Sequence, residues 1–366
     1  MTHTQTQTES KPQSEARTQA GGYRHAARIA AALLAVLALT TTLARAADKP
    51  PLDITGYTID ATLNPAKHTL DATAIVTFTA QQAVPEAEFQ LHGALKVHQV
   101  TDASGTALNG QRGPNETILV TPAAPLTAGQ SYTWTFRYSG TLDGSGGPVP
   151  GLKLASIGDP ISYLLYAGAW FPMTGYQIDR FTADIHIHIP AGYTVIGSGA
   201  VSPSAQPAVE TSAETSPKAS AKGAKGVAKS AMPTPMAKAA PAAGTTEYDF
   251  KWDKPGFPGT IIAGKFIETS SAPNIHLFTT AAHKADAHDY AKSALDIFAY
   301  FTSTFGMPES TRINIVELPD DTVPAYWAPE IAAVAGNRIP GKTAFRLLSN
   351  TIAHLWWGSE ISPATL

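Results

Sequence analysis

The ten residues FTADIHIHIP, at positions 181–190, decide the fold class of this sequence. Every second residue from Phe181 to Ile189 is apolar, and the residues between them are polar. A strand shows this period of two because successive side chains point to opposite faces of a sheet. The same alternation runs through 70–78 and 132–138, and turn residues separate the segments. We therefore predict an all-β domain of antiparallel strands over 48–200, with one face on a core and the other in water.

The polar face of the segment 181–190 carries two histidines. His186 and His188 are two residues apart, and Asp184 precedes them on the same face. Such a pair on a strand can chelate a metal ion. Nothing in the sequence supplies a third ligand, so a solvated outer face is the preferred interpretation.

Residues 201–247 interrupt the strand pattern with Ala, Ser, Pro and Lys in shuffled order. This composition cannot bury enough surface to offset the entropy of ordering, so we predict a disordered insertion. Strand character resumes at Tyr248 and runs through 261–266, which makes the insertion an extended hairpin loop within a β domain of residues 48–275. Its lysines could contact an acidic envelope surface, although such a run is more often simply solvated. These are Lys218, Lys222, Lys225, Lys229 and Lys238.

The apolar period changes near Asp286. Apolar residues then recur every three or four positions up to Gly306, which predicts a helix that ends at that glycine. A strand over 313–318, a proline-rich loop over 319–329 and a helix over 343–357 follow. This order indicates the beginning of a mixed α/β domain over 276–366.

The amino terminus carries the pattern of an export signal. Residues 1–23 are polar, and Arg24 and Arg28 precede an apolar run of eleven residues, 29–39. That run is shorter than the ~20 residues that span a bilayer. Ala44 and Ala46 form a small-residue cleavage site. We predict a disordered leader and signal peptide over 1–47, cleavage near Ala46, and a periplasmic, secreted or envelope-associated protein; retention of the segment as a membrane anchor is the alternative.

Composition excludes several function classes. The formal net charge is −3, from 26 Lys and Arg against 29 Asp and Glu, which lacks the basic footprint of a nucleic-acid-binding protein. The sequence has no cysteine, which excludes disulfides, thiolate metal sites and cysteine nucleophiles. Any metal must therefore be held by histidines and carboxylates.

Several stretches resemble the alanyl aminopeptidase family of zinc metallopeptidases, which includes leukotriene-hydrolase relatives. AWFP at 169–172, the strand at 181–190 and IAHLWWG at 352–358 carry the likeness, and the last is similar to the family's zinc helix, His-Glu-x-Ala-His-Gln-Trp-Trp-Gly. The resemblance implies a saddle-like β domain followed by a thermolysin-like domain. It also implies a zinc cofactor and removal of N-terminal residues from peptides or proteins.

The zinc helix departs from that pattern. The resemblance makes His354 the second zinc ligand, which puts Asn350 at the first ligand position and Thr351 at the position of the general base. An Asn amide is a poor zinc ligand, and Thr cannot accept a proton near neutral pH. The family's third ligand would fall at position 373, past Leu366. We therefore assign no catalytic residue, and only His354 remains as a candidate metal ligand.

The substrate segment departs in the same way. The family's Gly-x-Met-Glu-Asn falls on PAYWA at 324–328, so that Trp327 occupies the position of the glutamate that pairs with the substrate's amino group. Tyr326, Trp327 and Glu330 are the candidate substrate-binding residues, and Glu330 could replace the missing carboxylate only if the loop shifts.

Three functions are compatible with this sequence. The first is an exported aminopeptidase-family protein that is inactive because of Asn350, Thr351 and Trp327, and that uses its β domain as a binding surface. The second is a truncated piece of an active zinc aminopeptidase. The third is a structural or peptide-binding envelope protein.

Overall fold

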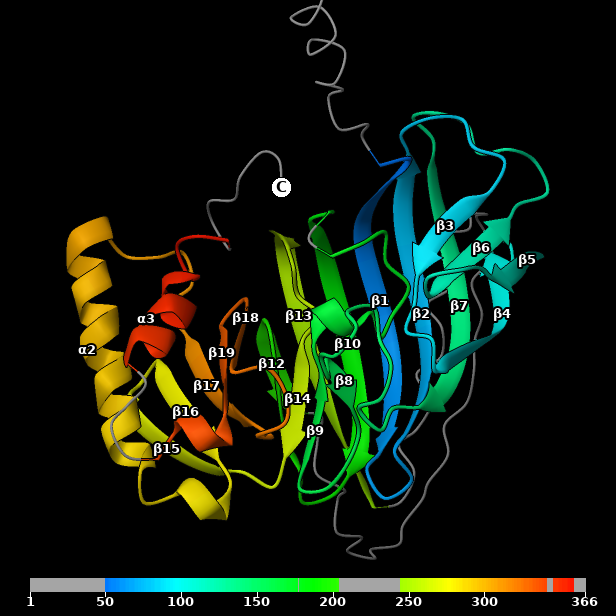
Figure 1. The fold of residues 1–366 in the computed structure, drawn as a ribbon. Helices are drawn as coiled ribbons and strands as arrows, with labels where there is room; N and C mark the ends of the chain where they lie inside the picture. Colours follow the sequence, from blue (N-terminus) through cyan, green and yellow to red (C-terminus); the bar gives the residue numbers. More distant parts are fainter. Residues whose placement is uncertain (1–49, 177, 204–243, 341–344, 359–366) are drawn as a thin grey trace, which may run out of the picture. The chain divides into compact units, whose positions relative to one another are not determined.

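The structure is a computed structural model that describes residues 50–176, 178–203, 244–340 and 345–358 (Figure 1). The predicted leader and signal peptide, and most of the predicted insertion, lie outside the described residues. Within the described residues, no helix is both long and apolar enough to cross a membrane.

Ten strands form the largest sheet, in the order β12-β13-β10-β1-β2-β7-β4-β5-β6-β3. Five of them are long: β1 (Leu52–Asn64), β2 (Thr69–Ala80), β7 (Ser131–Thr141), β10 (Phe181–Pro190) and β13 (Thr245–Gly256). The others are β3 (Ala87–Gln90), β4 (Leu95–Asp102), β5 (Ala107–Arg112), β6 (Thr117–Thr121) and β12 (Ala200–Pro203). The predicted fold class, a β domain followed by a mixed α/β part, is confirmed.

The sheet is mixed rather than purely antiparallel. β1 and β10 run parallel, with Ile59 opposite Ile185. Parallel neighbours need a long crossover connection, and more than a hundred residues separate these two strands. Alternation in the sequence reports which face is buried and not the direction of the neighbouring strand, which is why the sequence could not reveal this pair.

Strands β12 and β13 pair antiparallel, from Ala200 opposite Lys251 to Pro203 opposite Tyr248. The two ends of the segment 204–243 are therefore adjacent in one sheet. The predicted insertion of 201–247 is too wide at both ends, because 201–203 and 245–247 belong to strands. Sheet pairing with neighbours far along the chain overrides their weak local propensity.

A four-stranded sheet packs beside the first, in the order β11-β14-β9-β8. Its strands are β8 (Ala155–Ser156), β9 (Ile161–Leu164), β11 (Thr194–Gly197) and β14 (Ile261–Gly264), and the 3-10 helix η1 (Tyr166–Gly168) follows β9. The predicted motif AWFP begins right after η1. Trp170 and Phe171 are fully buried, and the indole Nε1 of Trp170 donates to the carbonyl of Gly259 over 2.6 Å.

The remaining sheet has five strands in the order β15-β16-β17-β19-β18. They are β15 (Ile267–Ala272), β16 (Ile275–Thr279), β17 (Ile313–Leu318), β18 (Ala325–Ala328) and β19 (Ile331–Ala335). The helices α2 (Ala287–Phe305) and α3 (Phe345–Ala353) accompany it, with the 3-10 helices η2 (Ala281–His283) and η3 (Gly336–Arg338). This sheet starts at Ile267, so the boundary predicted at 275/276 falls within β16.

Two details of this part differ from prediction. The segment predicted as a proline-rich loop, 319–329, contains the strand β18. This strand pairs antiparallel with β19. The helix predicted over 343–357 is regular only from Phe345 to Ala353, and tighter turns carry the chain to Gly358, where φ is +100°. Gly358 adopts this positive φ readily because it has no Cβ.

Every residue of β17 is buried, because both faces of this strand are covered. Ile313 and Ile315 pack with α2 and α3 in one apolar core. Val316 and Leu318 face the other way, onto a core shared with the four-stranded sheet. Coverage on both faces explains why apolar residues lie on both sides of this strand, with Asn314 and Glu317 buried among them.

The outer face of β10 is less solvated than predicted. His188 is buried, and its Nε2 lies 3.3 Å from a carboxylate oxygen of Asp60 on β1. The side chain of His186 is 21% exposed, and its Nδ1 lies 2.6 Å from a carboxylate oxygen of Asp249 on β13. The sequence could not show these partners because they lie on strands far away along the chain.

Asp179 is a buried acid just before β10. Its carboxylate accepts a hydrogen bond from the hydroxyl of Thr174, and burial raises its pKa from 3.8 to about 6. Between these two values the folded chain holds a proton that the unfolded chain has released. The free energy of unfolding therefore falls as the pH rises from about 3.8 to about 6, and the loss is complete above the higher value.

The substitution Asp179→Asn should remove that pH dependence. The unfolding free energy of the variant relative to wild type should rise by roughly 2–3 kcal/mol between pH 4 and pH 7.5, since each pKa unit corresponds to about 1.4 kcal/mol. Urea denaturation at both pH values measures the difference. If the unfolding free energies of the two proteins changed with pH in parallel, burial of Asp179 would not lower stability at neutral pH.

Candidate functional site

The candidate site begins where α3 ends. His354 follows the last regular turn, and its Nδ1 lies 2.8 Å from the carbonyl oxygen of Trp357. Since a carbonyl only accepts, Nδ1 carries the proton and Nε2 carries the lone pair. Burial lowers the pKa of His354 below its ordinary value, and the bond to Trp357 offsets part of this shift. The imidazole is therefore neutral near pH 7.

Trp327 of β18 covers the ring of His354. The two rings are stacked, with centroids 4.3 Å apart and an angle of 9° between their planes. The indole also fits closely over Gly358, where an added Cβ would come within 2.8 Å of it. Two of the predicted site residues, Trp327 and His354, are thus brought together, and one face of each ring is covered by the other ring.

Asn350 and Thr351 point to different surroundings. Asn350 is exposed on α3. Thr351 is buried, and its hydroxyl donates to the backbone carbonyl of Leu347 over 2.9 Å. This bond to the preceding turn is a common way for a helical threonine to satisfy its hydroxyl.

Little free space remains around these side chains. The cavity lined by Thr351, His354, Glu330 and Leu355 has a volume of about 10 Å³. A cavity of that size holds about one water molecule. A peptide cannot enter it in this conformation.

Glu330 is the most heavily engaged group of the site. Its carboxylate accepts from the Ser310 hydroxyl over 2.6 Å, from the backbone N–H of Gly199 over 3.2 Å and from Nε of Arg312 over 3.0 Å. Nη2 of Arg312 also donates both to this carboxylate and to the carbonyl of Gly199. The backbone of Glu330 is left-handed, with φ at +65°, and these contacts hold it there.

Tyr326 lies on the other face of β18. Its hydroxyl accepts from the backbone N–H of Ala167 over 3.1 Å, and burial raises the pKa of Tyr326 well above its ordinary value. The ring lines a largely apolar cleft of about 400 Å³ together with Tyr176, Leu152 and Val323. Because alternate residues of a strand face opposite sides, Tyr326 and Trp327 do not form one surface.

A second cleft, of about 370 Å³, opens beside Glu330 and Leu355. Arg180 and Lys254 line it, and Lys254 forms an ion pair of 2.7 Å with Glu309. Opposite charges at one opening suit a zwitterionic or peptide-like ligand. No local pattern in the sequence predicts this cleft, because its walls include residues of β13, of the segment before β17 and of the turn before β19.

The zinc that the resemblance implies does not fit the residues gathered here. His354 offers the lone pair of Nε2. Asn350 supplies only an amide, and Thr351 supplies a hydroxyl that already donates to the backbone. Zinc in proteins takes imidazole, thiolate or carboxylate ligands. The neighbouring carboxylate, that of Glu330, is held by Arg312, Ser310 and Gly199.

The sequence matches no known protein-family model and no curated protein. Solved structures are similar in fold. An M1 zinc metallopeptidase from Deinococcus radiodurans has a TM-score of 0.59 at 16% identity, over 85% of this chain and 65% of that chain. A two-domain M1 zinc metallopeptidase variant bound to L-arginine has a TM-score of 0.60 at 16% identity, with 85% and 66% covered. Native yeast LTA4 hydrolase has a TM-score of 0.61 at 12% identity, with 85% and 45% covered.

These likenesses concern the fold. They confirm the resemblance predicted from the sequence at the level of chain topology, and the fold of this chain matches the N-terminal region of M1 peptidases. The chain spans about two thirds of the length of the bacterial structures and under half of the yeast one. The roles predicted for Tyr326, Trp327, Glu330 and His354 remain predictions.

The ion pair of Arg312 and Glu330 should be a main determinant of stability at this site. Arg312→Leu leaves the carboxylate, whose side chain is 12% exposed, without its cation and should lower the unfolding free energy by about 3–5 kcal/mol. Arg312→Leu combined with Glu330→Gln should recover a large part of this loss. Denaturant unfolding of the single and double variants measures both effects.

Lys292→Ala is the matched control, because it breaks an exposed pair with Asp296 on α2. Its cost should stay below about 1 kcal/mol. An equal loss in Arg312→Leu and Lys292→Ala would contradict the importance assigned to the pair at Glu330.

Proposed function

We propose that this chain is an exported protein with the fold of an M1 aminopeptidase that binds peptides or protein N-termini without hydrolysing them. The observation that carries the proposal is the stack of Trp327 on His354. An indole fills the space in which the resemblance expects a carboxylate for the substrate's amino group, beside the histidine expected to hold zinc.

Hydrolysis of a peptide bond by a metallopeptidase needs a metal-bound water and a carboxylate that takes its proton. The resemblance puts Thr351 at the base position and Asn350 at a ligand position. Neither side chain exchanges protons or binds zinc near neutral pH. A small cavity beside His354 gives further support, since it has no room for a scissile bond.

Peptide binding is proposed for the cleft beside Glu330. Arg180 and Lys254 supply cations and Glu309 supplies an anion at the same opening. The cleft lies next to Leu355, which follows directly on His354, so a ligand there would lie near the position of the family's substrate. Nucleic acid is not expected as a partner because the net charge is −3.

The first test is enzymatic. The purified chain, supplied with Zn²⁺, should release no chromophore from aminoacyl p-nitroanilides above the level of the variant His354→Ala. Turnover that is lost in His354→Ala would overturn the proposal and favour the alternative, a piece of an active zinc aminopeptidase.

The second test addresses binding. Fluorescence anisotropy with short labelled peptides should show an affinity that falls at least tenfold in Lys254→Glu. The control Lys251→Glu makes the same charge change on the same strand, at an exposed residue paired with Asp253 and outside the cleft. Equal affinity in both variants would rule out this cleft.

We also propose export through the amino-terminal segment, with cleavage after Ala46. The mature protein recovered from the cell envelope or the medium should begin at Ala47, which mass spectrometry of its N-terminal peptide determines. An intact Met1 or Thr2 in that fraction would indicate retention as an anchor instead.

A further inference from the structure

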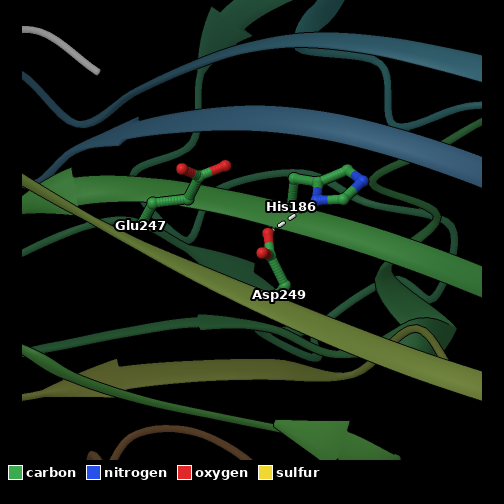
Figure 2. A group of neighbouring side chains, drawn as sticks. All are labelled: His186, Glu247 and Asp249. Carbon is green, nitrogen blue, oxygen red and sulfur yellow. Dashed lines mark hydrogen bonds and ion pairs between the residues drawn. The ribbon is translucent and has the colours of Figure 1, made fainter. Parts of the chain in front are cut away.

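We propose that His186, Glu247 and Asp249 form a binding site for a divalent transition-metal ion on the outer face of the ten-stranded sheet, apart from the candidate site at His354. The argument is independent of the proposed function, since it rests on β10 and β13 alone. Figure 2 shows the three side chains on the same face of these strands.

The register of the two strands creates the site. β10 and β13 are antiparallel, with His186 opposite Asp249 and His188 opposite Glu247. Residues two apart on a strand face the same side, so these four side chains form a two-by-two array. The core face of the same strands is occupied by Ile185, Ile187 and Phe250, so the polar array cannot turn inward.

Three members of the array converge. One ligand atom each from His186, Glu247 and Asp249 lies within 4.8 Å of the others. Glu247 is diagonal to His186, and the extra methylene of glutamate lets its carboxylate reach that far. His188 turns away to Asp60 on β1, where its Nε2 lies 3.3 Å from the carboxylate.

The chemistry of the donors suits a transition-metal ion. Two carboxylates balance the charge of a divalent ion, and an imidazole selects zinc and its neighbours over magnesium or calcium. Nδ1 of His186 lies 2.6 Å from a carboxylate oxygen of Asp249, in a hydrogen bond that a metal ion would replace. Ligands of zinc lie about 2.0–2.2 Å from the ion, so the two side chains need to part by less than about 1 Å.

A second layer of contacts orients the imidazole. Nε2 of His186 lies 3.4 Å from a carboxylate oxygen of Asp184, on the same strand. When Nδ1 binds a metal, Nε2 carries the proton and donates toward this carboxylate. A metal-binding histidine characteristically has such a partner, which fixes its tautomer and makes it a better donor.

The site is also accessible. The side chains of His186 and Asp249 are 21% and 24% exposed, so both can adjust and water can complete the coordination shell. Glu247 is buried, and its carboxylate has to approach the other two donors, because donor atoms around one tetrahedral zinc lie roughly 3.5 Å apart and the three atoms here lie within 4.8 Å of one another. The sequence showed the histidine pair but not the carboxylates, because the segment 204–243 separates them from β10 in the chain.

The test is Zn²⁺ binding to the chelator-treated chain. Equilibrium dialysis with elemental analysis should find about one zinc ion per chain, and zinc should raise the melting temperature. The variants His186→Gln and Asp249→Asn should weaken binding at least tenfold, the usual scale for loss of an important contact at a metal site. Co²⁺ should give visible absorption bands that are lost in the same variants.

Two controls separate this site from others. His276→Gln breaks a similar histidine–carboxylate pair, with Glu268 at 2.8 Å on β15 and β16, to which the described part of the chain adds no third histidine or carboxylate ligand. His354→Gln removes the candidate ligand of the zinc helix. Both should keep full zinc binding. Loss of zinc binding in His354→Gln but not in His186→Gln would overturn both this inference and the proposed function. Peptidase turnover by a chain that still binds zinc at His186 would overturn only the proposed function.

A charge-preserving variant guards against misfolding. Glu247→Asp keeps the carboxylate but shortens its reach to His186, so it should weaken zinc binding while the chain still melts cooperatively. Absence of zinc binding in the wild-type chain, or unchanged binding in both Glu247→Asp and His186→Gln, would refute the site.

Discussion

The ion pair between Arg312 and Glu330 connects the five-stranded sheet to the β domain, beside the apolar core that the five-stranded and four-stranded sheets share. Glu330 lies in the turn between β18 and β19, and Arg312 directly precedes β17. Together they bind both the N–H and the carbonyl of Gly199, between β11 and β12. The pair therefore joins the five-stranded sheet to the strands of the β domain, and it contacts the left-handed turn between β18 and β19.

The geometry of the candidate site follows from that turn. β18 presents Trp327 to His354 and Tyr326 to the opposite side. The stacked indole and imidazole are in close contact, and the cavity beside them has a volume of only about 10 Å³. The likeness of this chain to M1 metallopeptidases is one of fold, and the apolar frame of a fold does not depend on the polar residues of its site.

On the outer face of β10 and β13, polar rather than apolar side chains are brought together. There the sheet brings the imidazole of His186 near the carboxylates of Glu247 and Asp249 (Figure 2). The other ring nitrogen of His186 lies 3.4 Å from a carboxylate oxygen of Asp184. Cross-strand register, rather than any motif along the chain, selects which of these residues meet.

The sequence by itself determined the strand faces and the helix α2, because periods of two and of about 3.6 report burial directly. It also identified His354, Asn350, Thr351 and Trp327 as positions of interest. Only the tertiary structure decided that β1 and β10 are parallel, that Trp327 stacks on His354, and which carboxylates face His186. Those are contacts between residues far apart in the chain, and a local pattern carries no information about the partner across a sheet or beneath a helix.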